Sequence, residues 1–345
     1  MKPIHAIVTV LLCQGLLGNR GSLRCEVPLH RDSVIHFATQ HESATLLKKR
    51  DRFVTAMSSF DRQARLRVSR DVSEKEYLEY SSSQAIAWEG EEVTRLTRVI
   101  KKLEQRLATF KIPFPKRILL VRTTGKEEGG AAYCRGNGVI LPKGKPGPDS
   151  AAAERLLLHE LFHILSSHQR DLRHRLYALI GFHPCQEIQL PGELRNRKIT
   201  NPDGPRIAYF IELEENDEKF PVVPVLYSSV DRFPEGAKNF FQVMQFKLMR
   251  VIRMGDEWQA HLSDGTPTFL EVNQRKTKPA SLFAQIGKNT GYIIHPDEIL
   301  ADNFVHLVLD KQDLPSPQLV QGMRTLLTPA APEDSDHRPH QSTSP

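Results

Sequence analysis

The chain has 345 residues and a formal net charge of +6, from 47 basic and 41 acidic side chains. The basic residues are scattered and are not interleaved with aromatic residues, so we do not expect a nucleic-acid-binding groove. Beyond residue 22, no run approaches the roughly 18 apolar residues that a membrane-spanning helix needs. Composition therefore argues against a nucleic-acid-binding protein and against a stable membrane span.

Residues 1–22 resemble a secretory signal peptide. Lys2 is followed by a mostly apolar stretch at 4–17 and then by small and polar residues at 18–22. Cleavage of this segment would release a soluble protein, which we expect to be secreted or periplasmic.

Three cysteines would remain after cleavage: Cys25, Cys134 and Cys185. Their spacing does not match metal-binding pairs such as C-x-x-C. Two alternatives stay open, a Cys134–Cys185 disulfide with Cys25 unpaired, or three unbridged thiols.

Residues 23–112 are charged and have a largely helical pattern, so we expect a helical N-terminal region. Its clearest helix is predicted at 91–110, where apolar residues recur at helical spacing. These apolar residues are Val93, Leu96, Val99, Ile100, Leu103 and Leu107. Pro113 and Pro115 would end the helix.

We expect a second region at 113–327 to form the catalytic domain. Residues 116–122 have the composition of a short buried strand, which would open a sheet. A second strand is predicted at 139–141, directly after the turn signal Gly136-Asn137-Gly138.

A buried helix is predicted at 150–168. The segment holds neither glycine nor proline, and Asp149 or Ser150 would cap its N-terminus. The middle of the segment is apolar nearly all round, which is typical of a central helix. Polar side chains there are costly unless something satisfies them.

This helix carries His159-Glu160-Leu161-Phe162-His163, an H-E-x-x-H motif. Residues four apart lie on one helix face, so His159 and His163 can bind one metal ion. Zinc favours imidazole ligands, and a catalytic zinc keeps one position open for water. Glu160 would lie close enough to act on that water.

A catalytic zinc needs a third protein ligand. Nearby candidates are His168, which is out of register with the metzincin spacing, and Glu187 and Glu193, which have the surroundings of solvated surface carboxylates.

Further along the chain, a second helix is predicted at 171–180 and a turn-rich loop at 198–205. That loop would line a substrate cleft or serve as a plain connection. Short β-like runs separated by turns at 206–275 predict a β-rich insertion. The tail at 328–345 is rich in proline, serine and aspartate, and we expect it to be disordered.

A helix beginning at Pro296 offers a stronger third ligand. Proline at a first helical position followed by two acidic residues is typical of a helix start. Glu298 and Asp302 would then lie one turn apart on one face. Glu298 can bind the metal, while Asp302 can accept the free ring N–H of a ligand histidine.

An H-E-x-x-H helix followed by E-x-x-A-D on a later helix resembles the gluzincin group of zinc metallopeptidases. The resemblance implies that His159, His163 and Glu298 bind zinc. It also implies that Glu160 is the general base and that Asp302 orients a ligand histidine. The strand at 139–141 would be the sheet edge along which an extended peptide pairs.

We therefore predict an α/β (α+β) fold with a zincin-like catalytic domain and an exported zinc metallopeptidase that acts on peptide or protein substrates. Glu160 would take a proton from the zinc-activated water and deliver it to the leaving amine. Two alternatives stay open. One is a secreted, non-catalytic binding or scaffold domain that retains the zinc site, and the other is a zinc-dependent amide or ester hydrolase.

The oxyanion of such a reaction needs a hydrogen-bond donor besides the metal. Tyr292 and His295 precede the predicted Glu298 helix and are candidates by position, with Tyr209 as a third.

Overall fold

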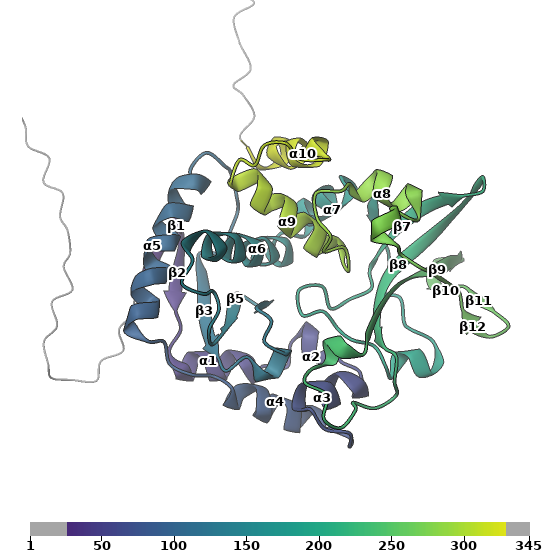
Figure 1. Ribbon diagram of the computed structural model, residues 1–345, viewed down its shortest axis with the longest axis horizontal. Helices are drawn as coiled ribbons and strands as arrows, with labels where there is room; N and C mark the ends of the chain where they lie inside the picture. Colours follow the sequence, from purple (N-terminus) through teal and green to yellow (C-terminus); the bar gives the residue numbers. More distant parts are fainter. Residues whose placement is uncertain (1–25, 329–345) are drawn as a thin grey trace, which may run out of the picture.

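The computed structural model describes residues 26–328 and shows a mixed α/β architecture, which confirms the predicted class (Figure 1). The predicted signal segment 1–22, Cys25 and the tail from residue 329 onward lie outside the described residues. A five-stranded sheet and the surrounding helices occupy one side of the molecule, and a second, β-rich part occupies the other.

The five-stranded sheet has the order β1-β2-β3-β5-β4. Its strands are β1 (Glu26–His30), β2 (Ser33–Phe37), β3 (Arg117–Thr123), β5 (Gly138–Pro142) and β4 (Tyr133–Arg135). The three central strands run parallel, and each edge is closed by an antiparallel hairpin. Strands β3 and β5 confirm the two predicted strands.

Besides its helices, the N-terminal region contains two strands that the sequence analysis did not predict, β1 and β2, which join the same sheet as β3. Each is only five residues long and β2 pairs with a strand far along the chain, so local periodicity gives a weak signal. The expectation that the strand at 139–141 forms the sheet edge is wrong. This strand is β5, and β4 pairs with its outer side and forms the edge instead.

Helices form the rest of the N-terminal region. They are α1 (Gln40–Leu47), α2 (Arg52–Ala56), α3 (Ser59–Leu66), α4 (Glu74–Ser83) and α5 (Gly90–Leu107). Each of the first four is preceded by an N-cap residue whose side chain accepts a backbone N–H of the helix. These N-caps are Thr39, Asp51, Ser58 and Ser73. Helix α5 confirms the predicted amphipathic helix and packs against β1.

Helix α6 (Ser150–His168) lies at the centre of the molecule. Asp149 caps it, and most of its C-terminal two thirds is buried. It packs against α5, β4, β5 and α9 (Pro296–Val308). Helix α7 (Arg170–Ala178) follows directly and confirms the helix predicted at 171–180, and α10 (Pro317–Leu327) packs on α9. Helix α6 is thus enclosed between the sheet and the C-terminal helices (Figure 1).

The predicted β-rich insertion at 206–275 supplies four strands of a second sheet with the order β10-β9-β8-β7-β6, and β6 joins it from an earlier part of the chain. These strands are β6 (Phe182–Pro184), β7 (Tyr209–Glu215), β8 (Glu218–Ser228), β9 (Met244–Met254) and β10 (Glu257–Ala260). Strand β13 (Phe269–Leu270) pairs with β9, β11 (Leu262–Ser263) pairs with β12 (Thr266–Pro267), and α8 (Ala280–Ile286) packs on β7. Short 3-10 helices are η1 (Lys126–Glu128), η2 (Gly192–Arg195), η3 (Phe240–Gln242) and η4 (Gln274–Lys276).

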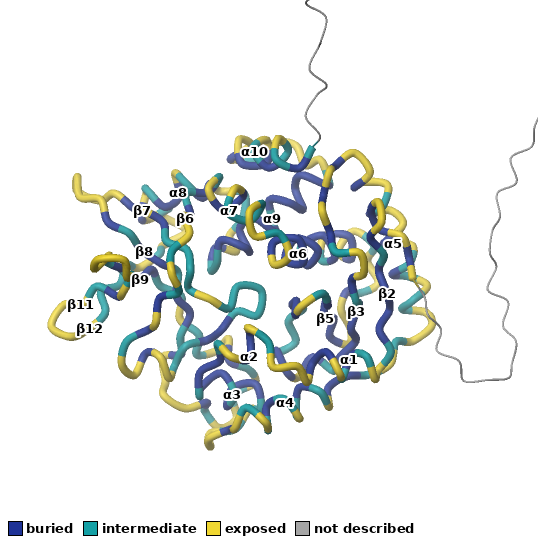
Figure 2. Tube along the Cα trace, turned by 180° about the vertical axis from the view of Figure 1, so that it is seen from behind, coloured by how far each residue is buried: buried dark blue, intermediate teal, exposed yellow. Residues whose placement is uncertain are grey.

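The core lies mainly around α6, α9 and the first sheet, and the tips of the second sheet are exposed (Figure 2). Within residues 26–328, no helix is long and apolar enough to cross a membrane. Cys134 and Cys185 are both free thiols, the first buried and the second half-buried. The Cys134–Cys185 disulfide, one of the two alternatives, is therefore not formed.

Candidate metal centre

Helix α6 brings the two motif histidines together as its periodicity predicts. The rings of His159 and His163 lie with their centroids 4.8 Å apart and nearly perpendicular. His163 is buried and His159 is half-buried. Leu161 and Phe162, which lie between them in sequence, are buried in the hydrophobic core. Packing of these two side chains fixes the helix, and the helix fixes the imidazole pair.

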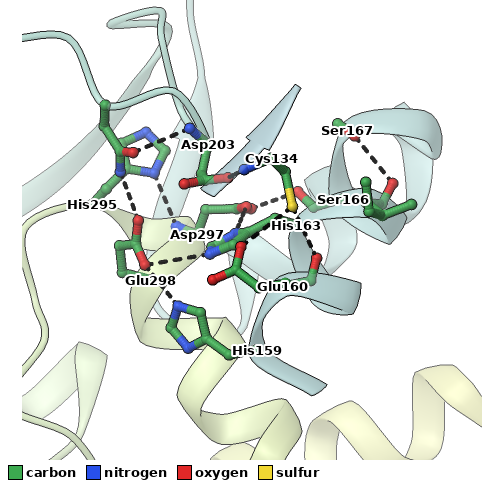
Figure 3. Close-up of polar contacts among 12 residues, drawn as sticks. Cys134, His159, Glu160, His163, Ser166, Ser167, Asp203, His295, Asp297 and Glu298 are labelled. Atoms are coloured by element: carbon green, nitrogen blue, oxygen red, sulfur yellow. Dashed lines mark hydrogen bonds and ion pairs between the residues drawn. The ribbon is translucent and has the colours of Figure 1, made fainter. Parts of the chain in front are cut away.

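Glu298 on α9 completes the group (Figure 3). Its Oε2 lies 3.0 Å from Nε2 of His159 and 3.4 Å from Nε2 of His163. One ligand atom from each of the three side chains lies within 4.8 Å of the others, a spacing suited to one metal ion. The structure therefore brings together the three residues that the sequence singled out from two distant helices.

The other ring nitrogen of each histidine contacts a carboxylate. Nδ1 of His159 lies 3.1 Å from Asp302, the partner that the sequence predicted. Nδ1 of His163 lies 2.7 Å from Asp297, a residue that the sequence analysis did not consider. A carboxylate on one nitrogen fixes the ring and directs the other nitrogen toward a metal. Both Nε2 atoms accordingly face Glu298.

Asp297 is the centre of a buried network. It is 1 % exposed and accepts hydrogen bonds from Ser166 Oγ at 2.5 Å and from the Tyr177 hydroxyl at 2.7 Å. Asp302 is more open and accepts a hydrogen bond from Thr290. The sequence offered one signal for Asp297, an acidic residue in the first turn of α9, but that position is common for solvated helix-start acids.

A loop at 198–205 reaches the site from the second sheet. Asn201 Nδ2 donates to Glu298 Oε1 at 2.6 Å, so the second carboxylate oxygen is also held. Asp203 Oδ1 accepts the backbone N–H of Cys134 at 2.8 Å. Of the two roles weighed for this loop, lining a cleft is the one that its position supports.

A buried ion network anchors that loop to the N-terminal helices. Arg65 is fully enclosed and pairs with Glu128 at 2.6 Å and with Asp61 at 2.7 Å. The same guanidinium donates to the Thr200 carbonyl, and Asp61 accepts from the Thr200 backbone and hydroxyl. The side chains beside the candidate ligands are therefore positioned partly from α3 and η1.

Glu160 borders a cavity of about 400 Å³ and is itself 3 % exposed. The Cys134 thiol lies 3.3 Å from Glu160 Oε2 and donates to it. Burial raises the pKa of Glu160 above its usual range, against the opposing effect of His163 and His159. Cys134, Glu160 and Asp203 form a second close group of potential ligand atoms. Sequence reasoning missed Cys134, whose neighbours follow no metal-binding pattern.

The electrostatics of the ligand group reflect its close packing. Burial lowers the pKa of His163, but the carboxylates of Asp203 and Glu298 outweigh it and raise that pKa well above its usual value. Burial raises the pKa of Glu298, but His163 and His159 outweigh it and hold that pKa well below its usual value. These groups stabilise one another as a set of opposite charges.

The three candidate oxyanion donors lie in different places. The Tyr292 ring stacks on His159 with centroids 6.1 Å apart, and it borders the large cavity. His295 does not line that cavity: its Nδ1 accepts the backbone N–H of Asp297 and caps α9. Tyr209 accepts from Arg173 and also lies outside the cavity lining. Of the three candidates, only Tyr292 borders the large cavity, whereas His295 uses its Nδ1 as a helix cap outside the cavity lining.

The structure does not bring the alternative third ligands to the histidine pair. His168 donates to the carbonyl of Ile164 at the end of α6. Glu187 pairs with Arg206, and Glu193 accepts from the neighbouring Asn196 side chain.

Comparison with protein families matches residues 122–171 to the eCIS core domain. The chain is similar to that domain from the end of β3 to the start of α7, a segment that includes the H-E-x-x-H helix but not α9. Comparisons with curated proteins and with solved structures gave no match.

Proposed function

We propose that this protein is a zinc-dependent metallopeptidase with a gluzincin-like site on a zincin-like catalytic domain. The observation that carries the proposal is the paired orientation of His159 and His163. Each histidine directs Nε2 toward Glu298, and its Nδ1 contacts a carboxylate, that of Asp302 or Asp297. In zinc enzymes, a ligand histidine commonly has a carboxylate on its second ring nitrogen, as His159 and His163 have here.

The residues present fit a catalytic zinc better than a structural one. Two imidazoles and one carboxylate are a common catalytic ligand set, whereas structural zinc sites are closed by four protein ligands. The cavity of about 400 Å³ borders all three side chains and leaves room for water and substrate.

When bound, zinc would supply an activated water and polarise the scissile carbonyl. Glu160 would accept the proton of that water and return it to the leaving amine. The Cys134 thiol holds one oxygen of Glu160, so it would act as a positioning residue. Tyr292 borders the cavity and is our candidate donor to the oxyanion, since His295 is committed to capping α9.

The N-terminal segment supports the remaining part of the proposal. Its pattern at 1–22 resembles a secretory signal peptide, so we propose a secreted or periplasmic enzyme acting on peptides or proteins. The alternatives of an amide or ester hydrolase and of a binding domain use the same ligand set, and substrate panels distinguish them.

The first test is metal content. We expect about one zinc per chain in the purified protein, with a large loss in His163→Ala. His168→Ala is a matched control, because His168 lies on the same helix but does not contact the ligand group. Equal zinc content in all three proteins would refute the metal site.

The second test separates catalysis from binding. Glu160→Gln should keep the metal, while hydrolysis of a broad peptide library falls by roughly 100-fold or more. Activity on amides or esters but not on peptides would support the alternative hydrolase. Zinc binding with no hydrolysis of any substrate class would support the binding domain.

A further inference from the structure

The large cavity has two cationic side chains on its wall, Arg155 and Lys145. Arg155 precedes His159 by one turn of α6, so both lie on the same face of the helix. Lys145 lies on the connection between β5 and α6. Both residues are exposed.

Neither cation is neutralised among residues 26–328, where no carboxylate oxygen comes within 4.0 Å of either. Glu154, the acid next to Arg155, pairs instead with Lys102 and Arg106 on α5. Asp302, which also lines the cavity, is engaged by His159 and Thr290. The two positive charges therefore face open space rather than a protein partner.

The backbone that carries Lys145 is held in place from inside the protein. Arg122 is 1 % exposed, and its Nη1 donates to the carbonyls of Pro142 at 2.8 Å and Lys145 at 2.7 Å. It also pairs with Glu92 on α5. Arg122 therefore links the connection to the sheet and to α5, and it fixes the backbone position of Lys145 beside the cavity.

Four apolar residues also line the cavity, Ala131, Ala132, Leu156 and Val305, and the rest of its lining belongs to the candidate metal centre and the residues around it. An aliphatic group can pack there while a negative end reaches the cations. We infer that the site selects substrates with a carboxylate beside the scissile bond, from an aspartate or glutamate side chain or from the peptide C-terminus. This inference rests on the proposed peptidase function and names its substrate class.

Peptide binding tests the inference without requiring turnover. Zinc-loaded Glu160→Gln protein would be titrated with fluorescent peptides that differ only in glutamate against glutamine at one scanned position. A second pair would differ only in a free against an amidated C-terminus. We expect at least one pair to show roughly 10-fold tighter binding of the acidic member at low salt, the scale of a charge-assisted contact.

Charge reversal provides the control. Arg155→Glu in the same background should reduce that ratio to below about 2-fold, whereas Arg170→Glu should retain it. Arg170 is exposed on α7, does not line the cavity and gives the same change in net charge. Zinc content and thermal unfolding would be measured for both variants to verify that the site is intact.

The outcomes for the two proposals differ. No preference in either peptide pair, or a preference unchanged by Arg155→Glu, overturns the carboxylate inference and leaves the peptidase proposal standing. A preference only in the C-terminal pair supports the inference and identifies the peptide terminus as its source. Absence of hydrolysis by the unsubstituted zinc-loaded protein contradicts the proposed function, while the binding ratio still decides the inference.

Discussion

Replacing Asp297 with asparagine should weaken zinc binding more than any other change outside the three ligands. The carboxylate of Asp297 receives three donors, from His163 Nδ1, Ser166 and Tyr177. Asparagine has one acceptor oxygen and an NH₂ group that cannot accept. If the amide oxygen stays on His163, the Ser166 and Tyr177 hydroxyls must turn to accept from the NH₂ group and lose their present acceptor. If the amide is turned the other way, its NH₂ group faces His163 Nδ1, so in either orientation the support of His163 is weakened.

The expected size follows from the burial of this network. Loss of a carboxylate behind a ligand histidine typically reduces metal affinity by 10–100-fold. Because Asp297 is 1 % exposed, water cannot replace the lost acceptor, and we expect the upper end of that range. A 100-fold loss corresponds to about 2.7 kcal/mol, which is comparable to a buried hydrogen bond to a charged group.

The assay is competition for zinc against a chromophoric chelator, with urea unfolding of the metal-free protein measured in parallel. Tyr177→Phe is the matched control, because it removes one hydrogen bond to Asp297 without touching His163. We expect it to lower stability by about 1 kcal/mol and leave zinc affinity within about 2-fold. If Asp297→Asn binds zinc as Tyr177→Phe does, the orienting role is refuted.

Three further changes have defined outcomes. Asp302→Asn should weaken zinc binding by roughly 10-fold in the same competition assay, less than Asp297→Asn because its side chain is 28 % exposed. Although burial raises the pKa of Glu42, hydrogen bonds from His36 and Thr39 lower that pKa to about 2. The stability that the ionised Glu42 side chain contributes is therefore present above about pH 4.5 and is lost toward pH 2. Urea unfolding should therefore find Glu42→Gln less stable by about 1 kcal/mol at pH 7, with no difference near pH 2. Arg65→Met should lower stability by about 3–5 kcal/mol in urea at pH 7, because it leaves two buried carboxylates unpaired.

The parts of the site that the sequence predicts correctly are those that depend on local spacing. Helix α6 has a clear start at Asp149 and no interruption, so the relation of His159 to His163 follows from helix geometry alone. The start of α9 at Pro296 is equally local. The approach of the two helices is not local: the sequence pattern makes Glu298 a candidate third ligand and the resemblance to gluzincins supports it, but neither derives the contact between α6 and α9.

The missed features depend on tertiary contacts. Asp297 and Glu298 are adjacent acids in one helix turn, and sequence alone does not tell which of them faces which histidine. The position of His295 suggests a catalytic donor, but in the structure its Nδ1 accepts a backbone N–H at the helix start. Cys134 reaches Glu160 only because the β4–β5 hairpin folds against α6.

Burial of polar groups does not by itself identify a functional site in this protein. Arg65 and its carboxylate partners are as deeply buried as His163 and Glu298. The charged atoms around Arg65, however, contact one another and the backbone, so that network is complete as a structural anchor. At the candidate metal centre, Nε2 of His159 and His163 and the Glu298 carboxylate converge beside a cavity. The contacts that orient these three side chains use their other polar atoms, Nδ1 of each histidine and Oε1 of Glu298. Stability alone does not require potential ligand atoms that are oriented by other residues and left open toward a cavity. This difference from the Arg65 network favours a functional site on α6 and α9.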